Sequence, residues 1–252
     1  MLESLFIPLD FLDGLMAGWL SELVRICVWG FVSGAAAMLL YLVTSDQESI
    51  VVLKKETSDL RKRMLKEDLP YNEVMNLMKE NLLVSFRFLR KVLTPSLLAS
   101  IPVLLIALWL GAFLTYTLPE NSESVSMDIV PPDSELSFKP ENRFIKHGDK
   151  VYFLPGKNAD PVSILSNKGL VYSGRPDNGP VSVVYKRQWW NTLVENGAGY
   201  IEPESPAQEI RWNFPRKLFL ESVPAWVATW EFPFFFSVFI VAFVLKVVLR
   251  IQ

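Results

Sequence analysis

The stretch that decides the fold is "RFLRKVLTPSLLASIPVLLIALWL", residues 87–110. Its cations Arg87, Arg90 and Lys91 lead, with no intervening loop, into an apolar run that carries no charge as far as Leu118. A bilayer core about 30 Å thick requires about 20 mostly apolar residues in a helix. The stretch therefore predicts a transmembrane helix that continues directly into a charged helix outside the bilayer.

Two further segments are apolar enough to predict membrane spans. Leu23–Val43 contains Arg25 as its only charged residue, and Phe232–Leu245 reaches a full span if Lys246 extends toward the headgroups. The residues before Arg25 include four acids and no base, whereas a signal peptide has a basic start. We therefore expect the first span to be retained, with residues 1–22 forming a short interfacial helix before it.

The distribution of charge predicts an orientation. Residues 44–92 and the end of the chain are net basic, whereas residues 1–22 are acidic. Because basic loops remain on the cytoplasmic side, we expect the N-terminus outside and the C-terminus in the cytosol of a cytoplasmic membrane, here the bacterial inner membrane.

Two antiparallel helices are expected between the first two spans. Leu53, Leu60 and Met64 share one helical face, and Pro70 ends that helix. The second helix then enters the bilayer, where Pro95 and Pro102 predict a kink or a widened turn. The apolar stripe predicted for this second helix consists of Val74, Met78, Leu82 and either Ser85 or Phe88.

Residues 119–222 have a different pattern. Short β-rich runs such as "PVSILSN" and "GLVYSG" alternate with turns rich in Pro, Gly and Asn, which predicts a small all-β, sandwich-like domain. The fold class is thus an α-helical membrane protein with three spans and an extracytoplasmic β-domain. Its predicted parts are an outer segment (1–22), a first span (23–43), a cytosolic hairpin (44–92), a second span (93–118), the β-domain (119–222), and a third span with a short tail (223–252).

The composition argues against an enzyme. The chain has one cysteine and one histidine, Cys27 and His147, and no glycine-rich phosphate-binding motif. A disulfide within the chain, a cysteine cluster and a multi-histidine metal site are therefore excluded, and no cofactor is expected. The net charge of −2 gives no indication of nucleic-acid recognition beyond a possible ribosome contact.

The order of these parts resembles the YidC/Oxa/Alb insertase superfamily, nearest the branch that includes the insertase subunit of the endoplasmic-reticulum membrane complex. The resemblance lies in "MNLMKENLLVSFRFLRKVLTPSLLASIPVLLIALWL" and "WNFPRKLFLESVPAWVATWEFPFFFSVFIVAFVLKVVLRI", and with residues 23–67 it covers about three-fifths of the chain. The resemblance implies insertion of client transmembrane segments through a polar groove. A β-domain between the second and third spans departs from the short connection of close relatives.

The same resemblance implies client-binding residues, each of which has a simpler interpretation. Arg25 is either a groove cation or an interfacial arginine paired with Glu22, and Glu231 either lines the groove or marks the interface. Met64, Met75 and Met78 offer a soft apolar surface to clients or form the hairpin core. The basic run "RKRMLK" is either a site for the ribosome or anionic lipid, or a solvated face.

A scaffolding subunit is the alternative function, in which the β-domain recruits an extracytoplasmic protein and the spans only anchor it. For that role, Trp189 and Trp190 are candidate partner contacts, but they are equally candidates for the core of the β-domain. A channel is disfavoured because the predicted spans contain few charges.

Overall fold

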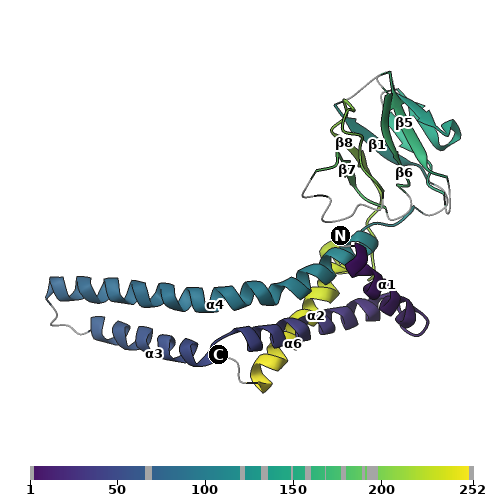
Figure 1. Ribbon diagram of the computed structural model, residues 1–252. Helices are drawn as coiled ribbons and strands as arrows, with labels where there is room; N and C mark the ends of the chain where they lie inside the picture. The colour runs from purple at the N-terminus through teal and green to yellow at the C-terminus, as the bar shows by residue number, and fades with distance from the viewer. Residues whose placement is uncertain are drawn as a thin grey trace. The chain divides into compact units, whose positions relative to one another are not determined.

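The structure is a computed structural model of the whole chain (Figure 1). It describes residues 3–65, 70–119, 123–131, 136–148, 150–156, 160–167, 169–176, 180–188, 191 and 198–249. Trp189, Trp190 and residues 68 and 69 of the turn predicted at 68–72 lie outside these ranges. The chain forms two compact units, Met1–Ile26 with Ala107–Pro233, and Cys27–Ile106 with Phe234–Gln252.

Among the described residues, three helices are long and apolar enough to cross a membrane, which is consistent with an integral membrane protein. They are α2 (Glu22–Thr44), α4 (Tyr71–Leu114) and α6 (Glu231–Val248). The sequence predicted all three. Each consists largely of long apolar side chains, which are solvated by lipid rather than by water when a helix crosses a bilayer.

Helices α2 and α6 approach each other closely at a pair of glycines spaced four residues apart. A Cβ atom added to Gly30 would lie 2.6 Å from the carbonyl oxygen of Phe234 and 2.7 Å from Cβ of Ser237. One added to Gly34 would lie 3.1 Å from the carbonyl oxygen of Val238. A side chain at Gly30 would therefore force α6 to shift, and one at Gly34 would require a smaller adjustment, as in small-xxx-small contacts between membrane helices.

The predicted hairpin consists of α3 (Gln47–Met64) and the first half of α4, which lie side by side (Figure 1). The side chain of Asp46 caps α3 by accepting a hydrogen bond from the backbone N–H of Ser49 at 3.1 Å. Helix α4 continues without interruption through Pro95 and Pro102. The expected direct connection between hairpin and second apolar run is therefore confirmed.

The face through which α3 packs was predicted correctly, and that of α4 in part. Ile50 and Leu60 of α3 are buried, and Leu53 and Met64 are half-buried. Of the stripe predicted for α4, Val74, Ser85 and Phe88 are half-buried, whereas Met78 and Leu82 are exposed. The less accessible stripe of α4 consists of Val74, Leu77, Asn81, Val84, Ser85 and Phe88. The positions of Met78 and Leu82 were predicted wrongly because this part of α4 carries two apolar stripes, and periodicity does not tell which one meets α3.

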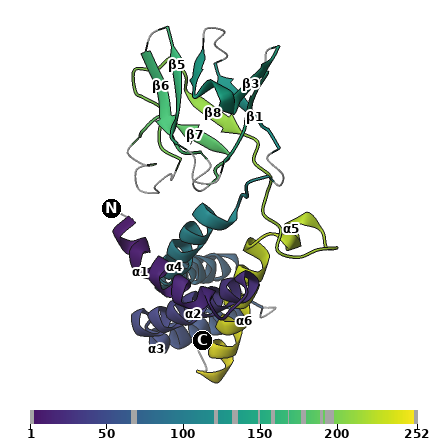
Figure 2. The same cartoon turned by 90° about the vertical axis from the view of Figure 1, so that its right-hand side faces the viewer.

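The β-domain contains two antiparallel sheets that share one core (Figure 2). The larger sheet has the order β3-β4-β1-β8-β7 and the smaller one β2-β5-β6. The strands are β1 (Val125–Val130), β2 (Ser137–Lys139), β3 (Phe144–His147), β4 (Lys150–Phe153), β5 (Val162–Ser166), β6 (Gly169–Gly174), β7 (Val183–Tyr185) and β8 (Glu209–Trp212). The predicted sandwich-like domain is thus confirmed.

The core of this domain is aromatic. Trp212 lies with its ring centroid 5.1 Å from that of Phe153 and 6.3 Å from that of Tyr172, which belongs to the other sheet. All three side chains are almost completely buried. Burial of rings of this size is the main apolar contribution by which so small a domain offsets its loss of conformational entropy.

Candidate functional site

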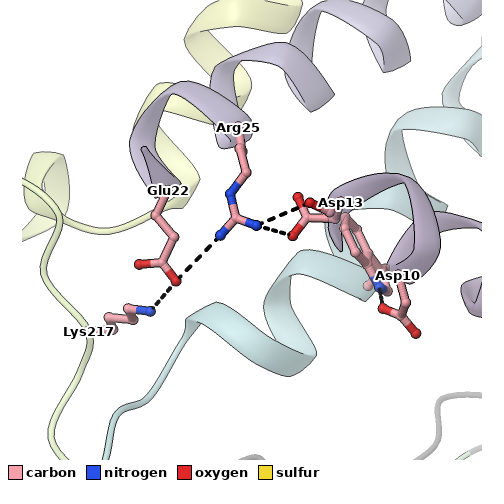
Figure 3. A network of polar contacts seen from close by, with 6 residues as sticks. Asp10, Asp13, Glu22, Arg25 and Lys217 are labelled. Carbon is pink, nitrogen blue, oxygen red and sulfur yellow. Dashed lines mark hydrogen bonds and ion pairs between the residues drawn. The ribbon is translucent and has the colours of Figure 1, made fainter. Parts of the chain in front are cut away.

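Arg25 lies in the first turn of α2 and belongs to a network of charges (Figure 3). Its guanidinium contacts the carboxylate of Asp13 at 2.6 Å and that of Glu22 at 3.9 Å. Asp13 is supplied by α1 (Glu3–Ala17), the short helix expected before the first span. Glu22 also accepts from the ammonium of Lys217 at 2.6 Å. The pairing with Glu22 that the sequence suggested is present, with Asp13 as the closer partner.

A second acid of α1 is also used inside this unit. The carboxylate of Asp10 accepts a hydrogen bond from the indole N–H of Trp109 on α4 at 2.7 Å. Asp10 and Asp13 are three residues apart and therefore lie on the same side of α1. Phe11 and Leu15 of the same helix are exposed. Helix α1 thus contacts the protein through Asp10 and Asp13 and leaves these two apolar side chains accessible.

Arg25 and Glu231, two residues expected at one site, are not joined. Glu231 is the first residue of α6, and one of its carboxylate oxygens is buried without a hydrogen-bond partner in the described part of the chain. The ion pairs of Arg25 go to Asp13 and Glu22 instead.

The three methionines differ in accessibility. Met64, the last residue of α3, and Met75 on α4 are half-buried. Met78 is 48% exposed. Of the three, only Met78 therefore has the exposed position that a surface for diverse apolar partners requires.

Met78 begins a continuous stripe of exposed apolar side chains along α4, here called the apolar ridge. It consists of Met78, Leu82, Phe86, Leu89, Leu93 and Leu97. Spacings of three and four residues place them on one helical face. The ridge begins in the part of α4 that belongs to the hairpin. It continues past Arg87, Arg90 and Lys91 into the uncharged part of α4. A second apolar stripe in the sequence was the available signal for it.

A polar groove lies at the base of the hairpin, here called the root groove. It has a volume of about 880 Å³ and is lined by Thr44, Asp46, Glu48, Ser49, Val52, Leu53, Arg87, Arg90, Lys91, Thr94 and Pro95. The ammonium of Lys91 lies 2.8 Å from the carboxylate of Asp46, which joins the start of α3 to α4. Hydrogen bonds from Lys91, and then from Ser49, hold the pKa of Asp46 well below its usual range.

Within the described ranges, no three His, Cys, Asp or Glu side chains come together as a metal-binding group. The site residues therefore form three features: a network of ion pairs around Arg25, the exposed apolar ridge, and the polar root groove. Comparisons with protein-family models, curated proteins and solved structures found no match, so the functional argument depends on these residues alone.

Proposed function

We propose that this protein is a membrane-protein insertase or insertase-like chaperone that helps transmembrane segments of client proteins enter the bilayer. The observation that carries the proposal is the apolar ridge. A soluble hairpin normally buries its apolar side chains, yet Phe86 is 67% exposed and Leu82 is 57% exposed. The ridge offers an apolar segment a contact surface outside the bilayer that continues into the span.

The mechanism follows from the cost of exposing apolar side chains to water. Burial of a leucine or phenylalanine side chain contributes about 1.5–3 kcal/mol. A client segment that lies along the ridge therefore remains shielded as it moves toward the lipid. Its polar flank has the root groove beside it, where Arg87, Arg90 and the hydroxyl of Thr94 replace some of the hydration that the flank loses. No covalent chemistry or nucleotide is required.

The proposed orientation places the hairpin in the cytosol of a bacterial inner membrane, with the N-terminus and the β-domain outside. The net positive charge of residues 44–92 supports this arrangement. In the cytosol the hairpin is accessible to a ribosome that carries a nascent client, and its basic run "RKRMLK" is available to the ribosome or to anionic lipid.

The proposal is tested by charging the ridge. The double variant Leu82→Glu/Phe86→Glu is expected to reduce insertion of a client with a short translocated tail by about tenfold or more, because a carboxylate repels the apolar segment from the ridge. Insertion is measured in proteoliposomes by protection of the client tail from protease. A photocrosslinker at Met78 should also capture the ribosome-bound client while its apolar segment emerges.

The matched control is Ile145→Glu/Leu170→Glu, which places the same two charges on exposed apolar positions of β3 and β6. It should insert clients like the unmodified protein. Equal insertion by the ridge variant and the control, for every client tested, would contradict the proposal.

A second candidate function is a scaffolding subunit, favoured by the separate core of the β-domain. The two segments that join the β-domain to the helices are hydrogen-bonded to each other, so this function can be tested by deleting the domain between them. The backbone N–H of Thr117 donates to the carbonyl of Pro215 at 3.0 Å, and that of Lys217 donates to the carbonyl of Thr115 at 3.1 Å. Residues 119–213 can therefore be replaced by a short Gly-Ser linker without separating these neighbouring ends.

We expect this deletion to leave insertion largely unchanged, because the ridge and the root groove are outside the deleted segment. Insertion is measured in the same proteoliposomes. Loss of an extracytoplasmic partner on affinity purification, together with unchanged insertion, would assign recruitment to the β-domain. Loss of insertion while the helices remain folded would contradict the insertase proposal in this form.

A further inference from the structure

We infer that the α4 side of the root groove binds the headgroup phosphate of an anionic phospholipid. Arg87 and Arg90 are both exposed and both line this groove. Within the described ranges, neither guanidinium forms an ion pair with a carboxylate. A guanidinium is shaped to donate two parallel hydrogen bonds to a phosphate. Two such groups, one helical turn apart, form a site for an anion.

The carboxylates that line the groove do not neutralise the positive charge of this site. Asp46 and Glu48 are the two carboxylates among its lining residues, against three cations. Asp46 already accepts from Lys91 and from both the backbone N–H and the hydroxyl of Ser49. Glu48 is therefore the lining carboxylate that is left to offset the charges of Arg87 and Arg90. The net charge of these three side chains is positive, which favours an anionic ligand.

A lipid is the favoured source of the phosphate because of where the groove lies along the helices. The uncharged part of α4 begins at Val92, immediately after Lys91, and that of α2 ends just before Asp46. The contact of 2.8 Å between Lys91 and Asp46 brings these two ends to one level. Charged residues at the ends of apolar helices lie among lipid headgroups. Leu93 and Leu97 are exposed beyond them and can pack against an acyl chain.

The experiment is native mass spectrometry of the full chain in detergent, with phosphatidylglycerol or phosphatidylcholine added at equal concentration. The unmodified protein should bind phosphatidylglycerol preferentially. Arg87→Gln/Arg90→Gln should lower the phosphatidylglycerol affinity by about thirtyfold, about fivefold for each arginine near a headgroup. The charge-conserving Arg87→Lys/Arg90→Lys variant should lose part of the preference, since lysine does not form the paired hydrogen bonds.

The matched control is Arg175→Gln/Arg187→Gln, which removes the same two charges from exposed positions of the β-domain, outside the root groove and the basic run at 61–66. It should retain the preference. Equal binding of the two lipids by the unmodified protein, an unchanged preference in the Arg87/Arg90 variant, or an equal loss in the control would each overturn the inference. Displacement of the lipid by millimolar inorganic phosphate would also overturn it, in favour of a soluble phosphate ligand. The readout is lipid occupancy, so its outcome is independent of whether the protein inserts clients.

Discussion

Replacing Trp212 with alanine is expected to destabilise the β-domain by about 3–5 kcal/mol, which is a large part of the stability of a domain of this size. The indole lies on β8, an interior strand of the larger sheet, and contacts Phe153 and Phe214, as well as Tyr172 of the smaller sheet. Its removal leaves a cavity where the two sheets meet. The neighbouring strands are paired on both sides of β8 and cannot close that cavity without losing backbone hydrogen bonds.

The measurement is limited proteolysis of the full chain in detergent micelles, together with near-ultraviolet circular dichroism. Cleavage should increase within residues 123–213 and remain low in α2 and α6. Trp19→Ala is the matched control, because that indole is 89% exposed and its removal creates no cavity. A Trp212 variant as resistant to protease as the Trp19 variant would show that the aromatic core does not hold the domain together.

Replacing Gly30 with alanine is expected to separate α2 from α6, at a cost of about 1–3 kcal/mol. The added methyl group would lie 2.6 Å from the carbonyl oxygen of Phe234, far inside normal contact distance. Phe234 and Ser237 are buried on α6, so the obstacle is the helix backbone and not a mobile side chain. The helices must move apart, and they then lose the close contacts that hold apolar helices together in lipid.

The free energy of unfolding is measured by titration with sodium dodecyl sulfate in mixed micelles, with helix separation followed by energy transfer between dyes on α2 and α6. Gly14→Ala serves as the control, because a Cβ atom at Gly14 has no neighbour within 4 Å. Alanine there should be neutral or slightly stabilising, as expected for a helix interior. If both variants unfold at the same detergent fraction, the close approach of the two helices is not important for stability.

The main elements were predictable because local signals are strong in this chain. An uncharged run longer than about 20 residues can span a bilayer as a helix. This depends on its length and composition rather than on the segments next to it in the fold. Likewise, Asp46 caps α3 through its own local sequence, since the hydrogen bond joins residues three positions apart. Two of the runs predicted from the sequence, "PVSILSN" and "GLVYSG", form β5 and β6, and each has Pro or Asn on both sides that ends it locally.

Strands β1, β2, β3 and β8 were not singled out by the sequence. Strand β8 has only four residues and pairs with β1, which lies more than 70 positions earlier in the chain. So short a segment has no periodicity that distinguishes it from a loop. Its place between β1 and β7 depends on partners that only the folded domain supplies.

The contacts of the candidate site likewise divide into pairs that the local sequence predicts and pairs that only the fold brings together. Glu22 lies three residues before Arg25, so this pair was visible in the sequence, but the contact of Lys217 with Glu22 joins residues 195 positions apart. No local pattern encodes that pairing. The sequence by itself determined the three apolar helices, the hairpin joined to α4 and the presence of a β-domain, because burial of backbone polar groups and apolar side chains fixes them locally. Only the tertiary structure decided which stripe of α4 closes the hairpin and which forms the ridge, because both stripes are apolar and the choice depends on the shape of α3.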